Sequence, residues 1–126
     1  MESRKYLKLN QIDCYKTSFR LSNKVWSFVK EWGYLEKDTI GKQFIRAVDS
    51  ISANIAEGFG RYNKKDKIRF YQISKGSLSE FKDWLMKAKV RGLLNDEQYN
   101  ELFILIKKIP LEINQLIKFT NMSLKD

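Results

Sequence analysis

Hydrophobic side chains recur at every third or fourth position along four long stretches of this chain, a spacing that places them on one face of an α-helix. The pattern predicts helices over about residues 11–32, 39–60, 64–91 and 96–120. The positions expected to face the core are Tyr15, Phe19, Ser22, Trp26 and Val29; Phe44, Val48, Ile51 and Ile55; Tyr71, Ser74, Leu78, Phe81, Leu85 and Ala88; and Tyr99, Leu102, Ile106, Ile109, Ile113 and Leu116. Val25, Phe28 and Trp32 widen the first of these stripes.

Short polar residues mark the starts of three helices. Thr39 is the predicted N-cap of the second helix and Asn63 of the third, since a side-chain oxygen there can accept a hydrogen bond from a free backbone N–H group. Asn95 precedes the fourth helix, and Gln98 stands at the position that completes a capping box. These signals agree with the points at which the hydrophobic periodicity begins.

Glycine residues mark the helix ends. Gly58 and Gly60 are predicted to close the second helix and Gly92 the third, because glycine adopts the left-handed conformation at a helix C-terminus without strain. Pro110 lies inside the periodic pattern of the last helix. It removes one backbone donor and is expected to kink that helix. Two shorter helices in this region are the alternative.

Short connections limit how four helices can pack. The most economical arrangement is an antiparallel up-down-up-down four-helix bundle, so we expect an all-α fold with a single domain over residues 1–126. The last helix holds more hydrophobic residues than one buried face requires, namely Phe103, Ile104, Leu105, Leu111, Ile117 and Phe119. Because each helix of a bundle keeps an outer face, this excess favours a homo-oligomer. The alternative is that the kink and the twist of the bundle hide most of these side chains.

Positive charge is concentrated in the third predicted helix. The formal net charge is +9, and residues 61–91 hold ten basic and three acidic side chains, a net charge of +7. A concentrated positive field attracts polyanions such as nucleic acids. The alternative is a solvated helix face whose lysines keep the protein in solution, and the sequence supports the two interpretations about equally.

The composition argues against several kinds of chemistry. The chain has no His, which removes the usual general base, metal ligand and pH switch. Cys14 is the single cysteine, so it forms no internal disulfide and no zinc site, and we expect it to act as a small hydrophobic residue in a reducing cytoplasm. No apolar segment follows the charged N-terminus, and the run from Leu102 to Ile106 is too short to span a bilayer. We predict a cytoplasmic protein with no metal, no cofactor and no membrane contact.

A row of polar residues follows one edge of the second helix, because its members are spaced by four, four, three and four positions. The row consists of Arg46, Ser50, Asn54, Glu57 and Arg61. We expect these side chains to form hydrogen bonds and ion pairs between helices or between subunits. A catalytic role is disfavoured because Ser50 has no His to accept its proton, and a carboxylate pair would require Glu57 and Glu80 to converge. We predict no catalytic residue and no enzyme activity.

Gly76 and Ser77 lie in the middle of the third predicted helix. Glycine costs about 1 kcal/mol relative to alanine at such a position. This cost suggests that a neighbouring helix approaches closely at Gly76. No strand precedes the pair, so a phosphate-binding loop of the P-loop kind is excluded.

The stretch from Arg46 to Arg61 resembles the signature of the 23S rRNA intervening-sequence protein family, whose core is Ser-Ile-x-x-Asn-Ile-Ala-Glu-Gly-x-Gly-Arg. Further residues that fit the family pattern are Phe70, Ile73, Gly76, Ser77, Glu80, Gly92 and Leu93. The resemblance covers about residues 15–118. Two differences concern details of local structure: Ser52 stands where many relatives carry Pro, and Trp32-Gly33-Tyr34 replaces a Phe-Pro pair.

The resemblance implies a four-helix bundle that assembles into a homopentameric ring. In the family, nucleic-acid binding is inferred from the location of the gene and from basic surfaces. A related branch serves as an accessory protein to reverse transcriptases of diversity-generating retroelements. The family-motif residues, which we expect to act in structure or at an interface, are Arg46, Ser50, Asn54, Glu57, Gly58, Gly60, Gly76, Ser77 and Glu80.

The candidate binding surface is the turn between the second and third helices. Its basic residues are Arg61, Lys64, Lys65, Lys67 and Arg69, accompanied by the aromatic residues Tyr62 and Phe70. Positive side chains beside a helix N-terminus suit phosphate, and each phosphate contact adds affinity through counterion release. We therefore predict a homo-oligomer that binds nucleic acid, RNA in preference to DNA. The alternative is a protein-interaction scaffold or an accessory subunit of a nucleic-acid-processing enzyme.

Overall fold

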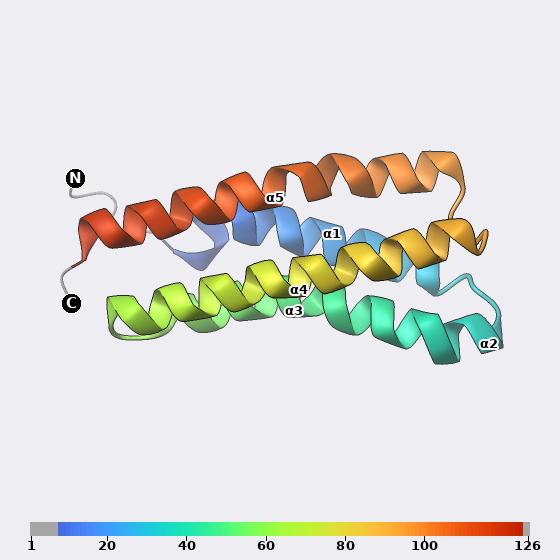
Figure 1. Cartoon of the computed structure of the whole chain (residues 1–126), viewed down its shortest axis with the longest axis horizontal. Coiled ribbons are helices and arrows are strands. Elements are labelled where there is room, and N and C mark those ends of the chain that lie inside the picture. The colour runs from blue at the N-terminus through green and yellow to red at the C-terminus, as the bar shows by residue number, and fades with distance from the viewer. Residues whose placement is uncertain (1–7, 125–126) are drawn as a thin grey trace.

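Four long helices dominate the computed structural model, which describes residues 8–124 (Figure 1). These helices are α1 (Asp13–Val29), α3 (Lys42–Phe59), α4 (Lys64–Val90) and α5 (Asp96–Ser123). The shorter elements are the 3₁₀ turn η2 (Leu9–Gln11), the single turn α2 (Tyr34–Glu36) and the π-helical turn η3 (Lys37–Gly41). No strand occurs within the described range, which confirms the all-α prediction for that part of the chain.

The long helices lie side by side along the long axis of the molecule (Figure 1). Helix α3 packs against α1 and α4, and α5 packs against the same two helices, so α3 and α5 occupy opposite corners of the bundle. The predicted stripes of α3, α4 and α5 face a common core, with only Tyr99 left partly buried at its edge. Within this core, the ring of Phe44 stacks on that of Phe81 at 4.7 Å and lies 6.0 Å from the ring of Trp32.

Helix α1 buries a face that overlaps only partly with the predicted one, since Val25 and Val29 are buried as predicted. Its buried residues are Cys14, Thr17, Ser18, Leu21, Val25 and Val29. Phe19 and Trp26 are 50% and 58% exposed, so the prediction that they face the core is wrong. The reason is that two hydrophobic stripes lie next to each other on this helix. Burying the one with the smaller side chains lets α1 approach its neighbours closely. Phe19 then lies at the edge of the α1–α3 contact, beside residues of α3.

Two of the predicted helix caps are confirmed. Asn63 Oδ1 accepts a hydrogen bond from the backbone N–H of Asp66 at 2.8 Å. Asn95 and Gln98 form a capping box in which each side chain accepts from the other's backbone N–H, at 2.7 Å and 3.0 Å. Helix α5 continues through Pro110 to Ser123, so the alternative of two shorter helices is wrong.

The predicted cap at Thr39 is wrong. Thr39 lies inside the π-helical turn η3, and its hydroxyl donates to the backbone carbonyl of Leu35 at 2.7 Å. Helical structure in this region begins already at Tyr34 and runs through α2 and η3 into α3. A threonine in a helix can satisfy its hydroxyl on the preceding turn, which removes the need for it to act as a cap.

The glycine predictions divide into two groups. Gly92 has a φ angle of 77°, and the N–H of Leu93 donates to the carbonyl of Ala88 at 2.9 Å, which is the predicted left-handed helix end. Gly58 and Gly60 do not adopt that conformation, because Gly92 alone among the described glycines has a positive φ. The prediction that this pair closes α3 through left-handed geometry is therefore wrong.

Gly58 is required for a different reason, namely that a larger side chain would collide with α4. A Cβ atom at this position would stand 2.7 Å from a ring carbon of Tyr71 and 2.9 Å from the backbone oxygen of Lys67, both on α4. Gly76 is the opposite case, since no heavy atom lies within 4 Å of a Cβ built there. The close helix approach that was predicted at Gly76 occurs within the chain at Gly58.

This contrast yields a matched pair of substitutions. We expect Gly58→Ala to lower the free energy of unfolding by about 1–3 kcal/mol, because the added methyl group overpacks the α3–α4 contact. We expect Gly76→Ala to raise it by about 0.5–1 kcal/mol, since alanine favours a helix and meets open space. Urea unfolding followed by circular dichroism measures the free energy of unfolding of each variant. Equal effects of the two substitutions would contradict the packing assigned to Gly58.

Candidate nucleic-acid interface

The turn between α3 and α4 gathers basic side chains at one end of the bundle. Residues 61–69 contain five basic side chains and one acidic side chain, a net charge of +4. This end also holds the first turn of α4, whose backbone N–H groups carry partial positive charge. The last turns of α5 lie beside it (Figure 1).

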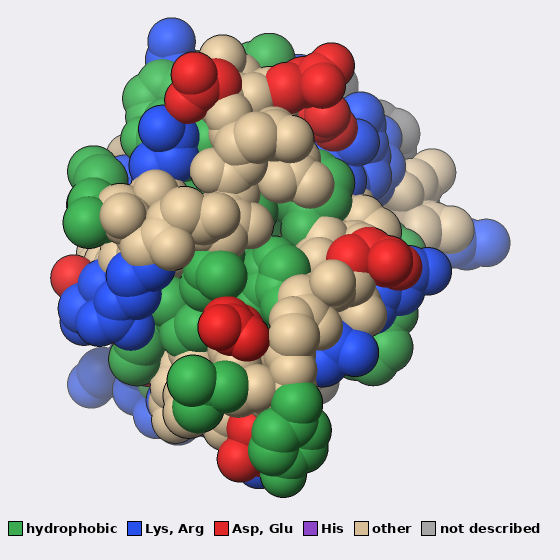
Figure 2. All heavy atoms as spheres, turned by 90° about the vertical axis from the view of Figure 1, so that its right-hand side faces the viewer, with side chains coloured by type: hydrophobic (Ala, Val, Ile, Leu, Met, Phe, Trp, Pro, Cys, Tyr) green, Lys and Arg blue, Asp and Glu red, His purple; other side chains and the backbone are tan. Residues whose placement is uncertain are grey.

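The opposite end of the bundle is not basic. Residues 30–42 hold three basic and three acidic side chains, and residues 87–101, from the last turn of α4 into α5, also hold three of each. Figure 2 looks onto this end and shows acidic and basic groups mixed with exposed hydrophobic ones. Charge is therefore polarised along the long axis of the molecule.

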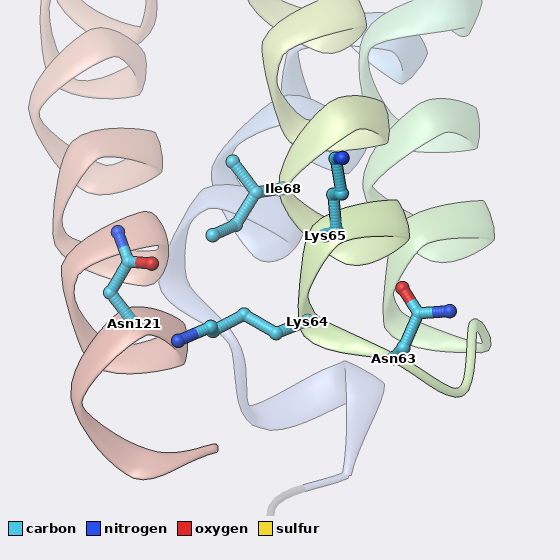
Figure 3. Close-up of a pocket in the computed structure, with 5 residues that line it drawn as sticks. All are labelled: Asn63, Lys64, Lys65, Ile68 and Asn121. Atoms are coloured by element: carbon cyan, nitrogen blue, oxygen red, sulfur yellow. The ribbon is translucent and has the colours of Figure 1, made fainter. Parts of the chain in front are cut away.

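Lys64 and Lys65 border a groove of about 750 Å³ between the start of α4 and the end of α5. Asn63, Ile68 and Asn121 complete its lining. The side chain of Lys64 extends across this space toward Asn121 (Figure 3). An anion in the groove would meet lysine side chains beside a helix N-terminus.

Lys67 connects two helices. Its ammonium donates a hydrogen bond to the backbone oxygen of Phe59 at 2.7 Å and lies 5.4 Å from the centre of the Phe59 ring. Burial lowers the pKa of Lys67 below its usual value. Lys67 thus links the first turns of α4 to the last residue of α3, and it holds the turn that presents the other basic residues.

Arg61 and Arg69 both stack on Phe70. Their guanidinium carbons lie 4.6 Å and 4.7 Å from the centre of that ring. Arg61 is also paired with Glu57 at 2.8 Å, and Arg69 lies 4.0 Å from a carboxylate oxygen of Asp66. Both arginine side chains keep substantial exposure, so they are oriented by these contacts and still face solvent.

Tyr62 is 98% exposed and lies in the turn beside Arg61. The sequence showed an aromatic residue among basic ones. The hydrophobic periodicity could not show that its ring would be exposed to solvent. An exposed ring beside cations offers a surface on which an unpaired base can stack. Asn121 and Ile68 were missed altogether. Asn121 could have been found from the expected antiparallel pairing, which brings the end of the last helix beside the start of the third.

The polar row of α3 mostly bonds to its own helix. The hydroxyl of Ser50 donates to the carbonyl of Arg46, and the amide of Asn54 donates to the carbonyl of Ser50, both at 2.8 Å. Within one chain, these two side chains therefore do not form the hydrogen bonds between helices that we expected, and the prediction is wrong for them in that respect. It is confirmed for Arg46, which pairs with Glu80 of α4 at 3.2 Å.

Other reactive groups are held in unreactive settings. Burial and the nearby charge of Glu112 raise the pKa of the Cys14 thiol to about 12. Within residues 8–124, no three His, Cys, Asp or Glu side chains gather as a metal site would require. No helix in the same range combines the length and apolar character needed to cross a membrane.

These observations define a small helical bundle with one basic end. The sequence model of the 23S rRNA-intervening sequence protein family matches residues 10–115, and the chain belongs to this family. This finding confirms the resemblance that the α3 motif indicated.

A similar solved structure supports the fold. It is the crystal structure of a protein of unknown function from the S23 ribosomal protein family of Bacteroides thetaiotaomicron. The two chains share 22% sequence identity with a TM-score of 0.73, over 83% of this chain and 98% of that one. At this identity the likeness concerns the fold alone. No curated protein matches this chain.

The two kinds of lysine can be separated by substitution. We expect Lys67→Ala to lower the free energy of unfolding by about 1 kcal/mol, because it removes a hydrogen bond between α4 and α3. Lys65→Ala removes the same charge from an exposed position, and we expect a change within about 0.5 kcal/mol. Urea unfolding tests the pair. A Lys67 variant as stable as the Lys65 variant would contradict the structural role of Lys67.

Proposed function

We propose that this protein is a non-enzymatic homo-oligomer that binds RNA through the basic end of its bundle. The observation that supports the proposal most strongly is the polarised charge, with a net charge of +4 over residues 61–69 and of zero over both residues 30–42 and residues 87–101. A polyanion is drawn to the first end and not to the second. Short connections between the long helices favour an up-down-up-down bundle, and the family resemblance favours a pentameric ring.

Phosphate groups are the expected primary contacts. Lys64 and Lys65 would hold phosphates at the groove beside the α4 N-terminus, while Arg61 and Arg69 extend the positive surface around Phe70. Such contacts give affinity without reading sequence. A ring would present the same surface several times to one RNA, which raises the overall affinity through effective concentration.

Unpaired bases favour RNA over duplex DNA in this proposal. Tyr62 projects almost fully into solvent among the basic residues. Single-stranded loops can stack a base on such a ring, whereas a duplex keeps its bases paired and stacked. The expected ligand is therefore an RNA with single-stranded segments, bound with little sequence preference.

The absence of catalysis is supported by the state of the candidate groups. Glu57 and Glu80 are each paired with an arginine, so neither carboxylate stands ready as a general base. Cys14 is fully buried with a raised pKa, and a thiol in this state is a poor nucleophile. The chain has no His that could activate Ser50.

The first test removes two lysines from the proposed surface. We expect the double variant Lys64→Ala/Lys65→Ala to bind a single-stranded RNA more weakly, and to reduce the slope of log affinity against log salt by roughly 0.7 per lysine. The matched control is Lys30→Ala/Lys37→Ala, which removes two exposed lysines near the opposite end. Fluorescence anisotropy titrations at several salt concentrations measure both variants.

Equal losses in the two double variants would show that overall charge, and not this surface, determines binding. If the unmodified protein fails to bind RNA even at low salt, the proposal is wrong. The scaffold or accessory-subunit alternative would then be pursued by identifying proteins that stay bound after nuclease treatment.

The second test concerns stacking on Tyr62. We expect Tyr62→Ala to weaken binding of single-stranded RNA by about 1–3 kcal/mol and to leave binding of duplex RNA nearly unchanged. Tyr34→Ala serves as control, because Tyr34 is also highly exposed but lies at the opposite end. An equal loss for single-stranded and duplex RNA would exclude stacking as the role of Tyr62.

A further inference from the structure

The outer face of α5 carries an unpartnered hydrophobic stripe. Ile104 and Leu111 are 60% and 62% exposed, and their separation of seven residues places them on one side of the helix. Of the other residues in the predicted hydrophobic excess, Leu105 is buried and Ile117 and Phe119 are partly buried, whereas Phe103 is 42% exposed. The exposed lysines of α5 are Lys107, Lys108 and Lys118.

A groove of about 270 Å³ lies between α1 and α3. On one side it is lined by Tyr15, which is partly buried against the core, and by Phe19, which is 50% exposed, both on α1. On the other side it is lined by small residues of α3, including Ala53 and Ala56. Small side chains along a helix let another helix approach closely, and the aromatic rings supply hydrophobic contact area.

Asp49 provides the charge of this groove. It lies among the lining residues, and no described basic side chain is paired with it. Partial burial raises the pKa of Asp49, while a hydrogen bond from Ser22 opposes that rise. A carboxylate in this setting would gain from a cation supplied by another molecule.

The two surfaces complement each other but cannot meet within one chain, because α3 and α5 occupy opposite corners of the bundle. One offers an apolar stripe flanked by lysines, and the other an apolar groove that contains a carboxylate. We infer that the outer face of α5 in one copy docks into the α1–α3 groove of the next copy. This inference rests on the homo-oligomer of the proposed function and assigns its interface.

Such a contact is head-to-tail, since each copy uses two different surfaces. Repeated contacts of this kind form a closed ring when the rotation between copies closes. A contact between identical surfaces would instead stop at a dimer. The arrangement therefore specifies how variants should behave when they are mixed.

The experiment uses one substitution on each surface. Leu111→Glu places a charge in the α5 stripe, and Ala53→Arg fills the groove with a long cation; both positions are exposed, so both variants should fold. We expect each to weaken self-association at least about 30-fold and to elute as a monomer in size-exclusion chromatography with light scattering. Val90→Glu, at a position of α4 that is 79% exposed, should assemble like the unmodified protein.

Mixing the two variants tests the head-to-tail geometry. The intact α5 stripe of the Ala53→Arg chain should dock into the intact groove of the Leu111→Glu chain and form a 1:1 heterodimer that grows no further. Two monomeric variants that fail to pair would overturn this geometry. Variants that assemble as the unmodified protein does would overturn the assigned surfaces and leave the homo-oligomer intact.

A monomeric unmodified protein would overturn the homo-oligomer and this interface together. Failure of RNA binding with normal assembly would overturn the RNA proposal alone, because neither Leu111 nor Ala53 lies in the basic turn. Circular dichroism spectra of each variant verify that the helices are retained.

Discussion

The close packing of α3 on α4 is the constraint on which the basic end of this molecule depends. Gly58 leaves room for the Tyr71 ring and for the backbone of Lys67, so the two helices meet directly beside the turn that joins them. Lys67 then bonds to the carbonyl of Phe59, and Asn63 caps the first turn of α4. Without this packing the turn would have no fixed direction, and its basic side chains would not share a surface.

The basic residues of the turn therefore have two different tasks. Lys67 stabilises the turn, Arg61 and Arg69 are oriented by Phe70, and Lys64 and Lys65 border the groove beside α5. Affinity for phosphate needs cations that keep their positions without being neutralised. In this turn, a backbone oxygen orients Lys67 and the Phe70 ring orients Arg61 and Arg69, and these two arginines also pair with Glu57 at 2.8 Å and with Asp66 at 4.0 Å.

Periodicity predicted the fold well where one hydrophobic stripe was unambiguous. It succeeded for α3, α4 and α5, and the caps at Asn63 and Asn95 were readable because their partners lie three residues away. It was only partly right for α1, where two hydrophobic stripes lie next to each other: Val25 and Val29 are buried as predicted, but Phe19 and Trp26 are not. The spatial role of Gly58 and the groove contact of Asn121 depend on residues far away in the sequence, so no local pattern could indicate them.

Hydrogen exchange with and without a single-stranded RNA oligonucleotide tests the central claim most directly. At low salt and saturating RNA, the account predicts slower exchange over residues 61–69 and at the end of α5, with no change over residues 30–42. Slower exchange centred on residues 30–42, or no change while the RNA is bound, would contradict the assignment of the basic end as the binding surface.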